Sequence, residues 1–219
     1  LARVRLNQIG SLTDQQAQGL SAIEQAGRLG NLGPYDWGDV LNLHPNWRGD
    51  LLDLTAEVQG AVDAGLDLAI RRGLQGPGTN IQGALGHFYA ARTLLTRFPG
   101  SRLRFEIDAP SREIDIQMST QGRTIDVEVK TNLGQAPTIA ERQIRRDLIR
   151  HVGDQFQDML YLYAPGQAGN LQAVHNAMLN QLQHADVLAA LQQNGISLAT
   201  AQAWLQQRFA QGLVGTFNY

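Results

Sequence analysis

Apolar residues recur at helical spacing over three stretches in the first half of the chain. A capping-box pattern that begins at Thr13 predicts a first helix of roughly 16 residues. Asp50 is expected to cap a second helix, with apolar positions over 51–70 and a glycine-rich breaker at 73–78. A third helix is predicted over 79–97 because Pro and Gly follow it directly.

Beyond residue 100 the apolar pattern changes to an alternation with a period of two. It predicts strands over 103–107, 113–118 and 124–131. A helix is then expected over 138–151, and a short apolar run predicts a fourth strand over 159–163. With the helix before them, the order is helix, three strands, helix, strand, which is typical of an α/β module with a mixed sheet.

These patterns divide the chain into three predicted regions. Residues 1–78 form a helical N-terminal region, residues 79–165 the α/β core, and residues 166–219 a C-terminal helical extension. The extension is rich in Gln and Ala, and Gly195 followed by Ser197 predicts a break between two helices there.

Composition narrows the class of protein. The chain has 219 residues, of which 43% are hydrophobic and 17% charged, values typical of a globular protein. The apolar runs are too short for a membrane span. The absence of Cys excludes disulfides, thiol catalysis and thiolate metal sites, and a net charge of −2 excludes a histone-like polycation.

Candidate chemistry is concentrated in the hairpin of the second and third strands. Ile and Val alternate with acidic residues in both strands, so each strand has one apolar and one polar face. If Gln121 and Gly122 form a two-residue turn, the register places Asp115 opposite Glu128, with Cβ atoms about 5 Å apart. Two facing carboxylates repel each other unless a cation lies between them.

Asp115 and Glu128 could therefore hold Mg²⁺ or Mn²⁺, with the carbonyl oxygen of Val129 as a further ligand. Lys130, the only lysine in the chain, is predicted on the same face. Its ammonium group could orient or deprotonate an attacking water, or neutralise charge that grows on a phosphate. The simpler interpretation is a solvated polar face on an edge hairpin, and the residue pattern leaves both open.

The segments Arg112-Glu-Ile-Asp-Ile-Gln117 and Asp126-Val-Glu-Val-Lys-Thr131 resemble the motif of the PD-(D/E)xK nuclease superfamily, which has the restriction-endonuclease-like fold. The resemblance covers residues 79–165 and is nearest to the Holliday-junction-resolvase-like branch. It implies that Asp115 is the motif Asp and that Glu128 and Lys130 form the Glu-x-Lys pair of a metal-dependent nuclease.

One position departs from the family pattern. Family members often carry a Glu in the first core helix, within Gly-x-x-Gly-Glu, where this chain has His87. A histidine can bind a metal, hydrogen-bond a water or contact a phosphate, and it can also be an ordinary helix residue. If the metal shell differs from that of the family, the neighbouring polar side chains of the hairpin are the alternatives: Glu113, Gln117 and Asp126.

The helix that follows the hairpin is basic. In this family a residue of that helix often supports the site, and the resemblance makes Arg142, Gln143 and Arg146 candidates. With Arg145 and Arg150, the arginines form one broad stripe suited to binding the phosphates of a nucleic acid. A solvated helix face is the alternative.

The expected function is a metal-dependent endonuclease that hydrolyses phosphodiester bonds in DNA or RNA. The chain begins without Met, as a piece of a longer protein would, and a nuclease behind a helical region resembles the C-terminal toxin domains of bacterial polymorphic toxins. That resemblance implies a bacterial effector, secreted or delivered into the cytoplasm of a target cell, and a cognate immunity protein as partner. A housekeeping resolvase or repair nuclease, and a non-catalytic module that binds nucleic acid or protein, remain the alternatives.

Overall fold

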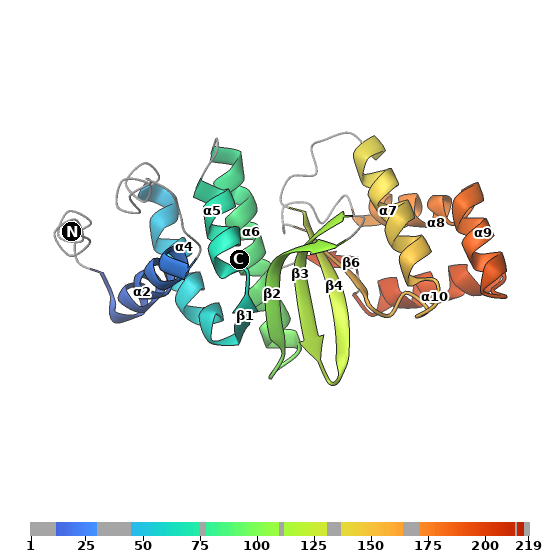
Figure 1. Cartoon of the computed structure of the whole chain (residues 1–219). Coiled ribbons are helices and arrows are strands. Elements are labelled where there is room, and N and C mark those ends of the chain that lie inside the picture. Colours follow the sequence, from blue (N-terminus) through green and yellow to red (C-terminus); the bar gives the residue numbers. More distant parts are fainter. Residues whose placement is uncertain are drawn as a thin grey trace. The chain divides into compact units, whose positions relative to one another are not determined.

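The computed structural model describes residues 12–29, 45–74, 78–109, 112–130, 137–163, 171–212 and 214–216 (Figure 1). The chain is an α/β protein with a mixed β-sheet, as the order of elements predicts. It divides into two compact units, residues 1–121 and 122–219. The predicted division into three regions, and the match of residues 79–165 to a restriction-endonuclease-like core, stay predictions.

The first unit combines helices with a small mixed sheet. Strand β2 (Arg102–Ala109) pairs in parallel with β1 (Val62–Ala64) and antiparallel with β3 (Arg112–Thr120). The helices are α2 (Asp14–Leu29), α4 (Pro45–Val58), α5 (Leu66–Leu74) and α6 (Gly78–Arg97), and a 3₁₀ turn, η1 (Gln59–Ala61), follows α4. Helix α6 packs against α4 and α5, and α2 packs against α4 and α5 (Figure 1).

Local sequence signals explain most of these elements. The capping box is present, because the Gln16 amide donates to Thr13 Oγ1 (3.2 Å) and the Thr13 amide donates to Gln16 Oε1 (3.3 Å). Helix α6 buries Phe88 and Leu94, and the Phe88 ring lies 5.6 Å from that of Phe105 on β2. The observed ends of α6 confirm the predicted third helix.

The predicted second helix is wrong in two respects. The observed helix, α4, begins at Pro45, so Asp50 lies inside the helix rather than at its N-cap. It also breaks into α4, η1, β1 and α5 instead of running on to residue 70. Gly65 lies between β1 and α5 and has φ of +83°, which favours glycine. A Cβ at this position would meet the carbonyl oxygen of Phe105 at 2.1 Å, so only glycine allows the backbone to pass here. Backbone pairing with β2 therefore overrides the helical spacing of the apolar residues.

A two-residue turn, Gln121–Gly122, separates β3 from β4 (Arg123–Lys130), and the boundary between the two units falls within it. Gln121 has φ of +48° and Gly122 has φ of +75°, the pair of positive values that a type I′ hairpin turn needs. The turn that was predicted from the sequence is confirmed.

Over its described residues, the second unit is built on parallel strands and four helices. Strand β5 (Met159–Tyr163) pairs in parallel with both β4 and β6 (Val214–Thr216). The helices are α7 (Pro137–His151), α8 (Leu171–Gln181), α9 (Ala185–Gln193) and α10 (Leu198–Ala210). Ser197 caps α10 by accepting from the Thr200 amide (3.1 Å), which confirms the predicted break. The sequence pattern missed β6 and the separation of α8 from α9.

One buried cluster holds the second unit together. Met159, Tyr161 and Tyr163 of β5 pack with residues of α7, α8, α9 and α10, among them Leu148, Met178 and Leu205. Within the described segments, no helix has the length and apolar character that crossing a bilayer requires.

Candidate functional site

The polar face of β4 is covered rather than solvated. Alternation along β4 places Asp126, Glu128 and Lys130 on one face, and parallel pairing sets Glu128 beside Tyr161 and Lys130 beside Tyr163. The Glu128 side chain is only 3% exposed, whereas that of Lys130 is 28% exposed. Lys130 Nζ donates to Glu128 Oε2 at 2.9 Å. The ammonium group therefore lies between a buried carboxylate and the solvent.

The acidic end of the same face is neutralised by helix α7. Arg150 Nη2 lies 2.9 Å from Asp126 Oδ2, and His151 Nε2 lies 3.7 Å from the same oxygen. The other ring nitrogen of His151 hydrogen-bonds to Asp154 Oδ2 at 2.8 Å. Burial lowers the pKa of His151, but the Asp126 and Asp154 carboxylates outweigh burial and raise that pKa to about 9.

Two buried tyrosines complete the surroundings of Glu128. Tyr161 donates its hydroxyl to Asp147 Oδ2 of α7, and both side chains are buried. Burial and the negative charges of Asp147 and Glu128 raise the pKa of Tyr161. Burial and the Glu128 charge raise the pKa of Tyr163. Both phenols therefore stay protonated and can only donate or accept hydrogen bonds at neutral pH.

In the first unit, two carboxylates from different strands flank His87 of α6. His87 Nδ1 lies 2.9 Å from Glu106 Oε1 of β2, and His87 Nε2 lies 3.9 Å from Asp115 Oδ1 of β3. The Glu106 side chain is 2% exposed, and that of Asp115 is 21% exposed. His87 thus lies between a buried carboxylate and a partly accessible one.

Glu106 also has an unusual backbone. Its φ is +51°, in the left-handed region that residues other than Gly, Asn and Asp rarely adopt. Phe105 pairs with Ile116 and Ile107 with Ile114, which leaves Glu106 opposite Asp115 in the antiparallel ladder. Such a conformation costs on the order of 1–3 kcal/mol and persists only where the surrounding structure imposes it.

Sequence reasoning identified His87, Asp115, Glu128 and Lys130 but missed Glu106 and Asp147. The structure brings His87 close to Asp115, and Glu128 close to Lys130. The register that joins Asp115 to Glu128 links the two units and stays a prediction, as does the role of the Val129 carbonyl. A charged residue within an apolar strand was the only available signal for Glu106, and the same signal occurs in many surface strands.

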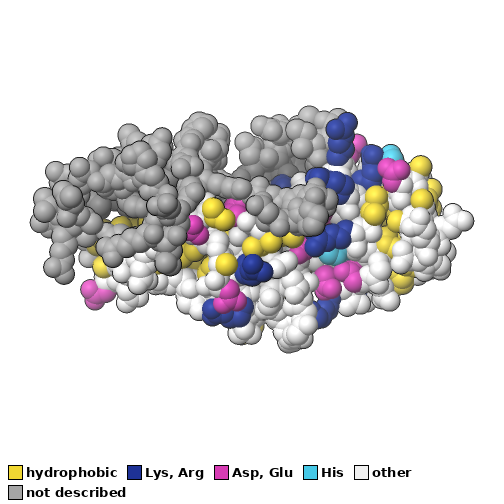
Figure 2. Space-filling view, viewed as in Figure 1, with side chains coloured by type: hydrophobic (Ala, Val, Ile, Leu, Met, Phe, Trp, Pro, Cys, Tyr) yellow, Lys and Arg dark blue, Asp and Glu magenta, His cyan; other side chains and the backbone are white. Residues whose placement is uncertain are grey.

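Lys and Arg side chains gather over α7, among acidic ones (Figure 2). Arg142 and Arg146 are exposed, and Gln143 is partly exposed. Arg145 and Arg150 complete the predicted stripe. Arg145 Nε donates to Gln181 Oε1 of α8 at 3.0 Å, and Arg150 pairs with Asp126. The exposure of Arg142 and Arg146 is what contact with a phosphate in solution requires.

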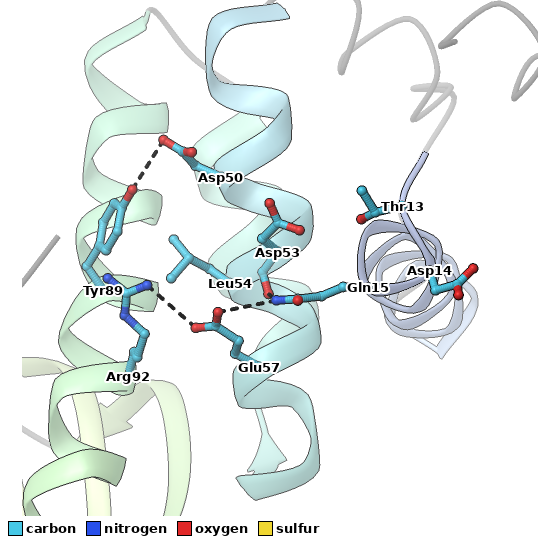
Figure 3. A pocket seen from close by; sticks show the side chains of 9 residues that line it. All are labelled: Thr13, Asp14, Gln15, Asp50, Asp53, Leu54, Glu57, Tyr89 and Arg92. Carbon is cyan, nitrogen blue, oxygen red and sulfur yellow. Dashed lines mark hydrogen bonds and ion pairs between the residues drawn. The ribbon is translucent and has the colours of Figure 1, made fainter. Parts of the chain in front are cut away.

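A separate cavity of about 660 Å³ lies between α2, α4 and α6 (Figure 3). Two of its acidic lining residues, Asp50 and Glu57, have partners on neighbouring helices. Tyr89 donates to Asp50 Oδ2 (3.2 Å), Gln15 donates to Glu57 Oε1 (3.2 Å), and Arg92 pairs with Glu57 (3.6 Å). These contacts join α2 and α6 to α4, so helix packing accounts for the positions of Asp50 and Glu57.

In the part of the chain that the structure describes, no group of three or more His, Cys, Asp or Glu side chains is arranged to hold a metal ion. The donor types of the predicted site nevertheless suit Mg²⁺ or Mn²⁺. Asp115 and Glu128 offer hard carboxylate oxygens, and Mg²⁺ is commonly bound through one or two carboxylates together with water and substrate phosphates.

No protein-family model matches this chain, and comparisons with curated proteins and with solved structures find no similar protein.

Proposed function

We propose that this protein is a nuclease that depends on a divalent cation and hydrolyses phosphodiester bonds in DNA or RNA. The observation that carries the proposal is the Glu128–Lys130 pair. The ammonium group of the only lysine is held 2.9 Å from a carboxylate that is almost fully buried, at the end of β4 where exposure increases. A site that receives a charged substrate needs a charged group within reach of solvent beside a fixed partner, and this pair provides both.

The proposed site combines Glu128 and Lys130 with Asp115, as the resemblance to the nuclease motif implies, within a core of the restriction-endonuclease-like type. Asp115, Glu128 and the Val129 carbonyl would hold the Mg²⁺ or Mn²⁺ ion. When bound, the cation would polarise a phosphate oxygen and lower the pKa of a water molecule. Lys130 would neutralise charge that develops on the phosphate.

The surroundings of Glu128 support this assignment. Tyr161 and Tyr163 are held protonated by burial and by the Glu128 charge, so they form a neutral wall behind the carboxylate. Asp126, the other acid on this face, is paired with Arg150 and His151. Glu128 is therefore the carboxylate of β4 that lies closest to the accessible ammonium group.

Outside the cleavage site, Arg142 and Arg146 would bind backbone phosphates, with Gln143 between them. The biological setting that we propose is a bacterial effector that is delivered into a target cell and neutralised by an immunity protein. Expression in a bacterial host tests the setting, because toxicity that Glu128→Gln removes would separate an effector from a housekeeping nuclease.

The decisive experiment incubates the purified protein with plasmid DNA, total RNA and tRNA in Mg²⁺ or Mn²⁺, with a chelator control. We expect cleavage of at least one substrate, loss of cleavage with chelator, and a decrease of at least about 100-fold in Asp115→Asn, Glu128→Gln and Lys130→Met. Asp186→Asn, which alters an exposed carboxylate of α9, is the matched control and should keep full activity.

Circular dichroism must show that each variant is folded. A folded wild-type protein that cleaves none of these substrates and binds neither cation in calorimetry would overturn the proposal. That result would favour a non-catalytic module. The feature that supports this alternative is His87, which stands where members of the nuclease family often carry a Glu.

A further inference from the structure

The contact between Glu106 and His87 combines three observations that are independent of the resemblance to nucleases. Glu106 is a buried carboxylate, its oxygen lies 2.9 Å from His87 Nδ1, and its backbone has φ of +51°. Strand pairing continues in the same register on both sides of Glu106, so no inserted residue explains the unusual backbone.

The chemistry of the two groups defines the state of the imidazole ring. A carboxylate accepts hydrogen bonds and cannot donate them, so the proton of a neutral His87 is favoured on Nδ1, beside Glu106. Nε2 then carries the lone pair, and it is the ring nitrogen that lies toward Asp115 Oδ1. The separation of 3.9 Å is too long for a direct hydrogen bond between Nε2 and Asp115.

We propose that Glu106 is a positioning residue, which holds the His87 ring so that the lone pair of Nε2 is presented beside Asp115. In this arrangement Nε2 can accept a hydrogen bond from a water molecule at the Asp115 carboxylate. The inference rests on the proposed nuclease function for its catalytic consequence, but the orientation of the ring is a property of the folded protein alone.

The position of the Glu106 carboxylate beside the His87 ring distinguishes a positioning role from ordinary packing. A carboxylate that served only to fill space in β2 would not need to face a ring nitrogen, and Glu106 is fixed there by both its burial and its backbone. Paired carboxylate and imidazole groups of this kind commonly set which ring nitrogen carries the proton. The His87 side chain is 14% exposed, compared with 2% for Glu106.

The first test uses nitrogen-15 NMR of the histidine rings, with His87→Gln to assign the His87 signals. At a pH high enough for the His87 ring to be neutral, the wild-type protein should show the Nδ1–H tautomer at His87. Glu106→Ala should lose that preference, and Glu106→Gln should keep most of it because the amide oxygen can still accept. An unchanged tautomer in a folded Glu106→Ala protein would overturn the proposal.

The second test uses cleavage kinetics. Glu106→Ala should lower kcat by about 10- to 100-fold with KM within about twofold, the range typical of residues that orient an active group. Glu106→Gln should recover part of kcat. The double variant His87→Ala/Glu106→Ala should be no slower than His87→Ala, because Glu106 acts through the ring.

Multiplicative losses in the double variant would show that Glu106 acts independently of His87, and would reject the proposal. If the wild-type protein cleaves nothing, the proposed function fails, and the NMR measurement still decides whether Glu106 positions His87. If Glu106→Ala does not fold, Glu106→Met replaces it in both tests, because methionine has a similar length but no carboxylate or amide oxygen that could accept from Nδ1–H. Loss of the tautomer preference in Glu106→Met supports the proposal, and an unchanged tautomer in a folded Glu106→Met protein overturns it.

Discussion

Lys130 Nζ lies 2.9 Å from Glu128 Oε2, and the carboxylate of this pair is far more buried than the ammonium group. Because of this asymmetry, the two residues are not equivalent for stability. Removal of Lys130 leaves a buried negative charge with less compensation, whereas removal of both charges leaves two neutral groups.

We therefore expect Lys130→Met to lower the free energy of unfolding by about 1–3 kcal/mol, after allowance for the partial exposure of Lys130. The double variant Glu128→Gln/Lys130→Met should recover part of that loss, and Lys130→Arg should retain most of the stability. Urea denaturation measures all three. A double variant less stable than Lys130→Met would contradict a role for Lys130 in compensating the Glu128 charge.

The left-handed backbone of Glu106 predicts how two substitutions at this position differ in stability. Glu106→Ala and Glu106→Gly both remove the carboxylate, but only glycine adopts φ near +51° without strain. Glu106→Gly should therefore be more stable than Glu106→Ala by about 0.5–1 kcal/mol, even though glycine normally weakens a strand. Thermal and chemical denaturation of the two variants test this order, and the reverse order would show that the left-handed conformation is not retained.

The buried His151 predicts a pH dependence of stability in the second unit. Its pKa is raised from an ordinary value of 6.5 to about 9, because Asp126 and Asp154 favour the charged ring more than burial disfavours it. A raised pKa contributes stability that is fully present below pH 6.5 and is lost as pH rises through 9.

The unfolding free energy of the wild-type protein should consequently fall between pH 6.5 and 9, by about 2–3 kcal/mol from this residue. His151→Gln should lack that part of the pH dependence. Urea denaturation across this pH range, compared between the two proteins, gives the difference directly. Parallel stability curves would mean that His151 is not charged in the folded state.

The basic helix α7 predicts how nucleic-acid binding depends on salt, if the proposed function holds. In an inactive Glu128→Gln background, Arg142→Gln/Arg146→Gln should weaken binding and lower the slope of log K against log salt by about one for each phosphate that is no longer neutralised. Arg145→Gln is the matched control, because its guanidinium group is bound to Gln181 within the second unit.

Fluorescence anisotropy with a labelled oligonucleotide, repeated at several salt concentrations, measures these slopes. An equal effect of Arg145→Gln would indicate a general loss of positive charge rather than phosphate binding by Arg142 and Arg146.

Local signals in the sequence were sufficient for most elements of the fold. The capping box at Thr13, the apolar spacing of α6, the alternation along β4 and the turn at Gln121–Gly122 all involve residues that are close in the chain. Their physical causes are side-chain caps, periodicity and backbone preferences, so neighbouring residues alone determine them.

Tertiary structure decided the remainder. The apolar spacing through Val62 and Leu66 fits a helix, but pairing with β2 makes Val62–Ala64 a strand. The neutralisation of Asp126 by α7, and the contact of Glu106 with His87, join residues that are distant in the chain. Burial and charge pairing depend on which distant groups come together in space, and no local pattern contains that information.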